Sequence, residues 1–189
     1  MEILREKTNS SLIGRDGSTL VVIDVQDKLM PVIVRREEVV KNIVKLIKFC
    51  KVCGIPIVLT EQYPKGLGRT IKEIKDELQG IKPIEKTSFS CFGSKEFKDA
   101  LKRSRAKTLL LVGIEAHVCV AQTAIEALER FKVCVVADAV SSRTSENAQV
   151  GLQRMRDSGA IISSTEMLMY ELLRDSRARE FKEVKQLLK

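Results

Sequence analysis

The chain alternates short apolar runs with segments of helical periodicity, and this alternation restricts the folds open to it. Runs that predict buried strands fall at residues 19–25, 56–60, 82–86, 108–112, 133–137 and 160–163. Helices are predicted at 37–53, 71–78, 94–104, 119–131, 145–158, 165–173 and, at the charged end, 176–189. Buried strands separated by helices predict a doubly wound, mostly parallel α/β sheet. The 189 residues fit one domain, with residues 1–18 as an N-terminal extension.

The composition argues against several classes of partner. The formal net charge is +8, but the basic residues are spread through the helices, and the eight aromatic residues form no platform beside them. We therefore expect no nucleic-acid partner and interpret the charge as a solvated surface or a preference for an anionic substrate. No apolar run approaches the ~20 residues that span a bilayer, so no membrane partner is expected. Five cysteines without a secretory signal predict a cytoplasmic protein with reduced thiols.

Two of the cysteines, Cys50 and Cys53, have the Cys-x-x-Cys spacing that also occurs in redox and zinc sites. The pair lies within the apolar periodicity of the helix at 37–53 and directly before Gly54, a residue typical of helix ends. No second cysteine pair is present to complete a zinc site. We interpret the pair as the last turn of an amphipathic helix, with a redox or metal role as the alternative.

Cys119 holds the position best suited to covalent chemistry. It follows the apolar run that ends at Gly113 and is expected at the start of the next helix. The unpaired N–H groups and partial positive charge of a helix N-terminus stabilise a thiolate, the reactive form of cysteine, and can also hold an oxyanion. The alternative is a buried cysteine that acts as a small core hydrophobe.

Polar side chains follow the predicted strands at the edge where open α/β sheets bind ligands. Asp24 follows the first strand, Lys86 ends the third and Cys119 follows the fourth. Together they supply a base, a cation and a nucleophile. One lysine contact at about 4 Å is worth about 4 kcal/mol at an effective dielectric near 20, enough to lower a thiol pKa by about three units. The alternative for Asp24 and Lys86 is a structural salt bridge.

Three motifs in these segments resemble the isochorismatase-like cysteine hydrolases. They are Val22-Ile-Asp-Val-Gln26, Glu85-Lys-Thr-Ser-Phe-Ser90 and Val112-Gly-Ile-Glu-Ala-His-Val-Cys-Val120. The resemblance covers residues 15–175 and keeps the motifs in order, which makes it far more specific than any one motif. The stretches Thr60–Gly68 and Ala137–Arg143 are similar to those of the isochorismatase-domain-containing subgroup.

The resemblance implies a fold and a set of catalytic residues. The fold is a single three-layer domain, with a six-stranded parallel sheet in the order 3-2-1-4-5-6 and helices on both faces. By their places in the motifs, Asp24, Lys86 and Cys119 are the expected catalytic residues. The resemblance also implies a cis peptide bond between Ile114 and Glu115, and an oxyanion hole made of the backbone N–H groups of Glu115 and Cys119.

The pocket and the assembly are less constrained by the motifs. We expect the substrate to contact Gln26, Gln62, Phe89, Phe92 and His117. The resemblance implies a homo-oligomer, a dimer or larger. Residues 32–34 and 167–169 offer apolar side chains for its contact surface, and these side chains could equally belong to the core.

One departure from the family concerns metals. The nicotinamidases of the family resemble one another in having a metal site built from one aspartate and two histidines. This chain has a single histidine, His117. We therefore expect no metal and no cofactor, and a nicotinamidase activity is disfavoured. His117 is interpreted as a hydrogen-bonded loop residue rather than a proton shuttle, and Glu115 as either structural or a contact for a substrate cation.

The leading hypothesis is a metal-independent cysteine hydrolase that cleaves a small amide, carbamoyl or related substrate through a thioester. Vinyl-ether cleavage, as in isochorismatase, is the alternative, with Asp24 as the acid and no essential sulfur. A third hypothesis, from a different class, is a non-catalytic interaction or thiol-sensing protein on the same fold.

Overall fold

A computed structural model describes residues 12–188, so most of the predicted N-terminal extension, residues 1–11, lies outside the described residues. The six strands are β1 (Ser18–Ile23), β2 (Ile57–Gln62), β3 (Ile84–Lys86), β4 (Thr108–Ile114), β5 (Lys132–Ser141) and β6 (Ile161–Ser163). They form one sheet in the order β3-β2-β1-β4-β5-β6, and every pair of neighbouring strands is parallel. This confirms the predicted fold class and strand order.

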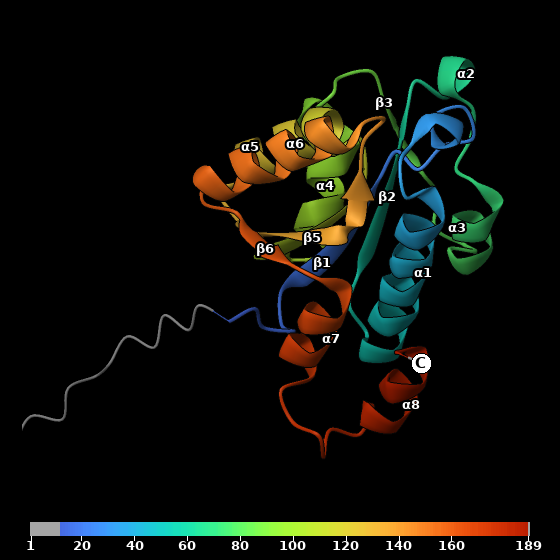
Figure 1. The fold of residues 1–189 in the computed structure, drawn as a ribbon. Helices are drawn as coiled ribbons and strands as arrows, with labels where there is room; N and C mark the ends of the chain where they lie inside the picture. The colour runs from blue at the N-terminus through green and yellow to red at the C-terminus, as the bar shows by residue number, and fades with distance from the viewer. Residues whose placement is uncertain (1–11, 189) are drawn as a thin grey trace, which may run out of the picture.

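Eight α-helices lie within residues 12–188, and helices pack on both faces of the sheet (Figure 1). They are α1 (Arg36–Cys53), α2 (Pro64–Leu67), α3 (Lys72–Glu77), α4 (Lys95–Arg103), α5 (Ala121–Ala127), α6 (Ser145–Asp157), α7 (Thr165–Leu173) and α8 (Phe181–Leu187). Three shorter turns are the 3-10 turns η1 (Met30–Val32) and η2 (Cys91–Gly93) and the π-helical turn η3 (Ala116–Val120). None of the helices within residues 12–188 is both long and apolar enough to cross a bilayer.

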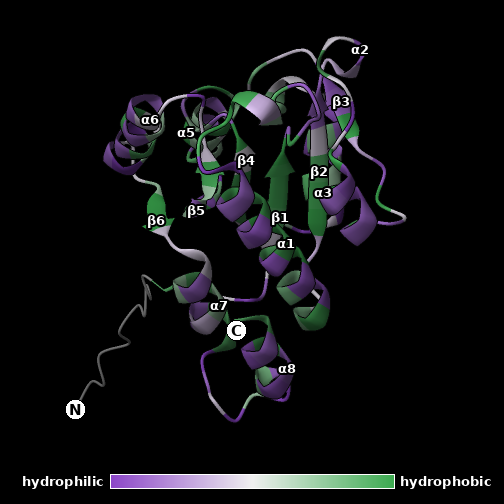
Figure 2. Cartoon of the chain, turned by 45° about the vertical axis from the view of Figure 1, so that its right-hand side comes forward, coloured by the Kyte–Doolittle hydropathy of each residue, from purple (hydrophilic) through white to green (hydrophobic). Residues whose placement is uncertain are grey.

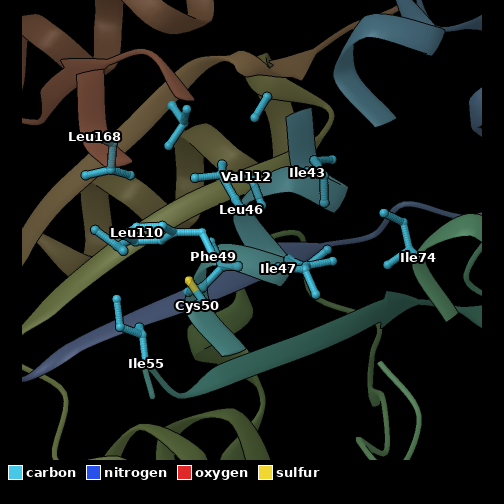
Figure 3. Close-up of a cluster of buried hydrophobic side chains, with 14 of the residues drawn as sticks. Ile43, Leu46, Ile47, Phe49, Cys50, Ile55, Ile74, Leu110, Val112 and Leu168 are labelled. Carbon is cyan, nitrogen blue, oxygen red and sulfur yellow. The ribbon is translucent and has the colours of Figure 1, made fainter. Parts of the chain in front are cut away.

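Alternation along the strands divides the interior into two apolar layers. On one face, Leu110 and Val112 of β4 pack with Leu46 and Phe49 of α1 and with Leu168 of α7 (Figure 3). On the other face, the intervening strand residues pack against α4, α5 and the Met155 side of α6. Both faces are therefore covered, and the apolar strands lie inside a shell of helices with polar outer sides (Figure 2).

Some predicted boundaries were wrong. The strand predicted at 133–137 continues to Ser141, because after a register shift Val140 and Ser141 pair with the end of β4. The last helix begins at Phe181 rather than at 176, since the chain first turns through Arg174, whose φ is +65°. The helix predicted from 119 begins as the π-helical turn η3 and continues as α5.

The part of the N-terminal extension that is described packs on its own chain. Ile13 is fully buried and its N–H donates to Glu171 Oε1 at 2.6 Å. Arg15 donates to the carbonyl oxygen of Cys53, at the end of α1, and pairs with Glu180 at 2.8 Å. These contacts join the start of β1 to three helices of the same layer.

The Cys-x-x-Cys pair lies where the sequence predicted it. Cys50 and Cys53 are buried in the last turn of α1, and Gly54 ends the helix with a φ of +66°. All five cysteines of the chain are free, and burial raises the pKa of the Cys50 and Cys53 thiols. The two thiols are thus buried parts of the α1 packing surface.

Candidate active site

Three side chains from distant parts of the chain meet at the carboxyl edge of the sheet. Asp24 follows β1 and Lys86 is the last residue of β3. The Lys86 Nζ lies 2.7 Å from Asp24 Oδ2, and the two side chains are 1% and 0% exposed. Cys119 follows β4 and is 6% exposed, and its thiol lies close enough to Asp24 for the charge of the carboxylate to raise the pKa of the thiol. The structure therefore brings together the carboxylate, the ammonium and the thiol that were predicted from three strand ends.

The backbone at this edge is unusually close-packed. A Cβ added to Gly113 would lie 2.1 Å from the Ile23 carbonyl oxygen, and the φ of Gly113 is +115°, so a side chain cannot be accommodated there. Asp24, which follows Ile23, has a positive φ of 52°, a conformation that aspartate tolerates better than most residues. The close approach of β1 and β4 thus places Asp24 next to the segment that carries Cys119.

The Lys86 ammonium is surrounded by acceptors. Besides Asp24, its Nζ donates to Gln62 Oε1 at 2.7 Å and to the carbonyl oxygens of Ser88 and Phe89 at 3.2 and 3.1 Å. Burial lowers the pKa of Lys86, but the charge and hydrogen bond of the Asp24 carboxylate outweigh this effect and leave the pKa raised. Lys86 is therefore held as a fixed positive charge beside Asp24.

Thr60 holds the second oxygen of the Asp24 carboxylate. Its Oγ1 donates to Asp24 Oδ1 at 2.7 Å, and both side chains are fully buried. Sequence reasoning gave Thr60 no role. The available signal was its place at the end of the strand next to β1, where Thr60 pairs with Ile23, the residue before Asp24.

The surroundings of Cys119 differ from those that the sequence led us to expect. The residue lies four positions after the N-cap Glu115, inside η3, rather than at a free helix N-terminus, and it is 6% exposed. Burial and the neighbouring Asp24 charge raise the pKa of the Cys119 thiol, and the Lys86 charge lowers it only in part. The net result is a raised pKa, the opposite of the lowering expected from a helix N-terminus and one lysine, so the Cys119 thiol needs a base to become a thiolate.

The peptide bond between Ile114 and Glu115 is cis, at the position implied by the resemblance. Within residues 12–188, the Glu115 N–H makes no hydrogen bond to another backbone group. The Glu115 side chain is paired with Arg143, whose N–H, Nε and Nη2 donate to its two oxygens at 2.7 to 3.1 Å. Burial raises the pKa of Glu115, but these donors outweigh it and leave the pKa lowered. Of the two interpretations of this side chain, the structure favours the structural one.

The structure distributes the predicted pocket residues over different roles. Gln26 is fully buried, and its amide bonds the backbone of Gln62 and Gly68. Gln62 donates to the Thr87 carbonyl at 2.7 Å and accepts from Lys86. His117 Nδ1 lies 2.9 Å from Ser142 Oγ, as a hydrogen-bonded loop residue would. Their contacts with a substrate stay predictions.

The two predicted aromatic contacts lie in different surroundings. Phe89 is 54% exposed, two residues after Thr87, which lines a hollow of about 460 Å³ beside Lys86. Phe92 instead packs against Phe97 and Phe131, with ring centroids 5.2 and 6.0 Å apart. The geometry of Phe92 gives its predicted contact with substrate no support.

The side chains that could bind a metal ion do not converge in the described part of the chain. Within residues 12–188, no three or more histidine, cysteine, aspartate and glutamate side chains gather closely enough to hold a metal ion. The single histidine is bound to Ser142. The two oxygens of the Asp24 carboxylate accept from Lys86 and Thr60.

Known proteins share both the motifs and the fold. The Isochorismatase domain profile matches residues 18–167. Isochorismatase domain-containing protein 2 of Danio rerio is 41% identical over 180 residues, which cover 93% of this chain and 90% of that protein. The structure of MAR1 ribonuclease from Caenorhabditis elegans has a TM-score of 0.89 at 38% identity, covering 94% of this chain and 92% of that one. The YcaC gene product of Escherichia coli, an octameric hydrolase of unknown specificity, has a TM-score of 0.88 at 23% identity, covering 94% and 89%, and is similar in fold. The profile match and the identity over nearly the whole length show that this chain belongs to the isochorismatase-like hydrolase family.

Proposed function

We propose that this protein is a metal-independent cysteine hydrolase that cleaves a small amide, carbamoyl or related C–N bond through a thioester on Cys119. The observation that carries the proposal is the buried Asp24 carboxylate, which accepts from the Lys86 ammonium at 2.7 Å and whose charge acts on the neighbouring Cys119 thiol. A buried base beside a thiol and paired with a fixed cation is an arrangement suited to nucleophilic catalysis.

The first half of the reaction forms the thioester. Asp24 takes the proton of the Cys119 thiol as the sulfur attacks the substrate carbonyl carbon, and the carbonyl π electrons move to oxygen. The N–H groups of Glu115 and Cys119 hold this oxyanion. Asp24 then gives the proton to the departing amine as the C–N bond breaks. Lys86 offsets the negative charge on whichever group, carboxylate or sulfur, carries it.

The second half releases the acid. Water attacks the thioester carbonyl, Asp24 takes a water proton, and the same N–H groups hold the second oxyanion. Collapse of this intermediate breaks the C–S bond, and the proton returns from Asp24 to the sulfur. The resting thiol is thereby restored, which matches the raised pKa of Cys119.

Removal of the sulfur tests covalent catalysis most directly. We expect Cys119→Ala to abolish turnover of a panel of small amides and carbamoyl compounds, and mass spectrometry of the wild-type protein in lysate to find an acyl adduct on Cys119. Cys134→Ala is the matched control, since it removes another buried cysteine from the middle of the sheet and should keep activity. Full turnover by Cys119→Ala would refute the thioester.

Alkylation and oxidation of Cys119, and a wider substrate panel, separate the alternative functions. Vinyl-ether cleavage needs the Asp24 proton but no nucleophile, so it would survive alkylation of Cys119 by iodoacetamide only if the alkyl group leaves room for the substrate. Loss of thiol reactivity on oxidation, with no turnover of any panel member, would favour a thiol sensor. The name of the Caenorhabditis elegans relative adds RNA to the panel as a second candidate substrate, and the net charge of +8 is compatible with it.

We also propose that the chain acts as a homo-oligomer in a reducing, cytoplasmic setting. Val32 and Met167 are 58% and 61% exposed, whereas their neighbours Ile33, Leu168 and Met169 are buried. Val32 and Met167 are therefore available for contact between copies, and the five free thiols fit a reducing compartment. The octameric Escherichia coli hydrolase offers a precedent on the same fold. Light scattering after size exclusion measures the number of subunits.

A further inference from the structure

A second hollow, between α4 and the end of α5, differs from the rest of the surface in its charge. It has a volume of about 400 Å³, and none of the three catalytic side chains lines it. Five of its lining residues are basic and one is acidic, a formal charge of +4 and half of the +8 carried by the whole chain. The basic residues are Lys95, Lys98, Lys102, Arg105 and Arg130.

A larger groove on the opposite face of the sheet does not share this excess of positive charge. That groove, of about 880 Å³ between α1, α3 and α8, is lined by four basic and four acidic residues. In the hollow at α4, Lys102 has the Asp99 carboxylate at 3.7 Å. The other four cations have no carboxylate within ion-pair distance among residues 12–188. Clustered cations without counter-charges attract an anion.

The floor of this hollow is aromatic. Phe92 and Phe131 line it, and both are half-buried. Phe92 meets Phe97 edge to face at 5.2 Å and Phe131 at 6.0 Å, so the core holds both rings in place while part of each remains open to the hollow. A flat aromatic ligand gains packing on such rings, and the volume lies in the range of small-molecule sites.

We propose that this hollow binds a small aromatic anion of the nucleoside-phosphate type. Its ring would lie on Phe92 and Phe131, and its phosphate would be held by Lys98, Arg105 and Arg130 at the rim. The site is separate from the hydrolase chemistry proposed above and does not depend on it. The sequence alone does not show this binding site, because its aromatic and basic residues come from two segments that only the fold brings together.

Calorimetric titration of the intact chain with adenosine 5′-monophosphate tests this site. We expect saturable binding, with adenosine and inorganic phosphate each binding at least about tenfold more weakly, since each lacks one half of the ligand. The double variant Lys98→Glu/Arg130→Glu should also bind at least about tenfold more weakly, and added salt should weaken the wild-type interaction. Arg36→Glu/Lys41→Glu is the matched control, since it reverses one exposed arginine and one exposed lysine in the charge-balanced groove.

Several outcomes would overturn the proposal. They are the absence of saturable binding to the wild-type chain, equal affinities in the two double variants, and phosphate that binds as tightly as the nucleotide. A single-stranded RNA oligonucleotide that binds far more tightly than the mononucleotide would overturn the small-molecule ligand and show a nucleic-acid surface instead. Hydrolase activity is not the readout, so failure of this site leaves the proposed function intact.

Discussion

Two ion pairs lie at the same edge of the sheet and differ in their exposure to solvent. Asp24 and Lys86 pair across 2.7 Å, and so do Glu115 and Arg143. Each carboxylate directly follows a central strand, β1 or β4. The exposures of the side chains differ: 0% and 1% for the first pair, and 7% and 59% for the second. The two pairs therefore differ in interaction energy despite their equal distances, because water screens the Glu115–Arg143 pair and does not reach the Asp24–Lys86 pair.

The surroundings of the two pairs indicate what each is for. Asp24 and Lys86 are held from all sides by Thr60, Gln62 and two carbonyl oxygens. Glu115 holds both the backbone N–H and the guanidinium of Arg143, and so ties the segment after β5 to the segment after β4. The first pair sets the charge beside Cys119, the proposed nucleophile, and the second positions a loop.

The largest effect is expected from breaking the buried pair. Lys86→Met leaves the Asp24 carboxylate buried without its cation, which should cost about 3–5 kcal/mol of unfolding free energy. Turnover should be lost as well. Urea denaturation measures the stability, with Lys72→Met as the control, since Lys72 forms an exposed pair with Asp76 and its loss should cause no measurable change. Wild-type stability in Lys86→Met would mean that the two pairs do not differ as described.

A smaller effect is expected at Thr60. Thr60→Val keeps the volume of the side chain but removes the donor to Asp24 Oδ1. A hydrogen bond to a charged group contributes about 1.5–3 kcal/mol, so kcat should fall about ten- to hundredfold if the bond positions the base. Thr60→Ser, which keeps the hydroxyl, should restore most of the activity.

Thr123→Val is the matched control for Thr60. Thr123 is also fully buried, and its hydroxyl accepts the Cys91 N–H at 3.0 Å without contacting Asp24. This variant should lose stability, because a buried N–H is left unpaired, yet keep kcat within a few-fold. If Thr60→Val kept wild-type kcat, or both variants lost activity equally, the positioning role of Thr60 would be wrong.

The sequence predicted the parallel sheet and the three converging side chains because these depend on patterns local to each segment, whereas the strand order followed from the family resemblance. Asp24, Lys86 and Cys119 each end or follow an apolar run, and parallel strands bring such positions to one edge. The raised pKa of the Cys119 thiol was missed because it depends on burial and on the charge of Asp24, which follows another strand. The Arg143 partner of Glu115 was missed because it depends on the register between β4 and β5. Pairing across strands is a property of the assembled sheet, which no single segment displays.

The smallest effect is expected from the exposed Glu115–Arg143 pair. The stability that this pair contributes should change with pH in a direction set by the pKa of Glu115. Arg143 donors hold the pKa of Glu115 below the ordinary glutamate value of 4.5. A lowered pKa in the folded state adds stability above about pH 4.5, and this stability is lost as the pH falls through the lower folded value. Because Arg143 is 59% exposed, Arg143→Ala should lose much less stability at pH 7 than Lys86→Met. Because the pKa of Glu115 is lowered, the difference in stability from wild type should vanish on acidification.

Urea denaturation at pH 7, 5 and 3 measures this difference, with Arg177→Ala as the control. Arg177 forms an exposed pair with Asp175 and touches no part of the site, so it reports the generic effect of losing a surface arginine. The backbone N–H of residue 143 still donates to Glu115 in the variant, so the loop should keep its place and kcat should change less than in Thr60→Val. A stability difference that grows on acidification, or one as large as that of Lys86→Met, would show that the Glu115 pair is energetically a buried one.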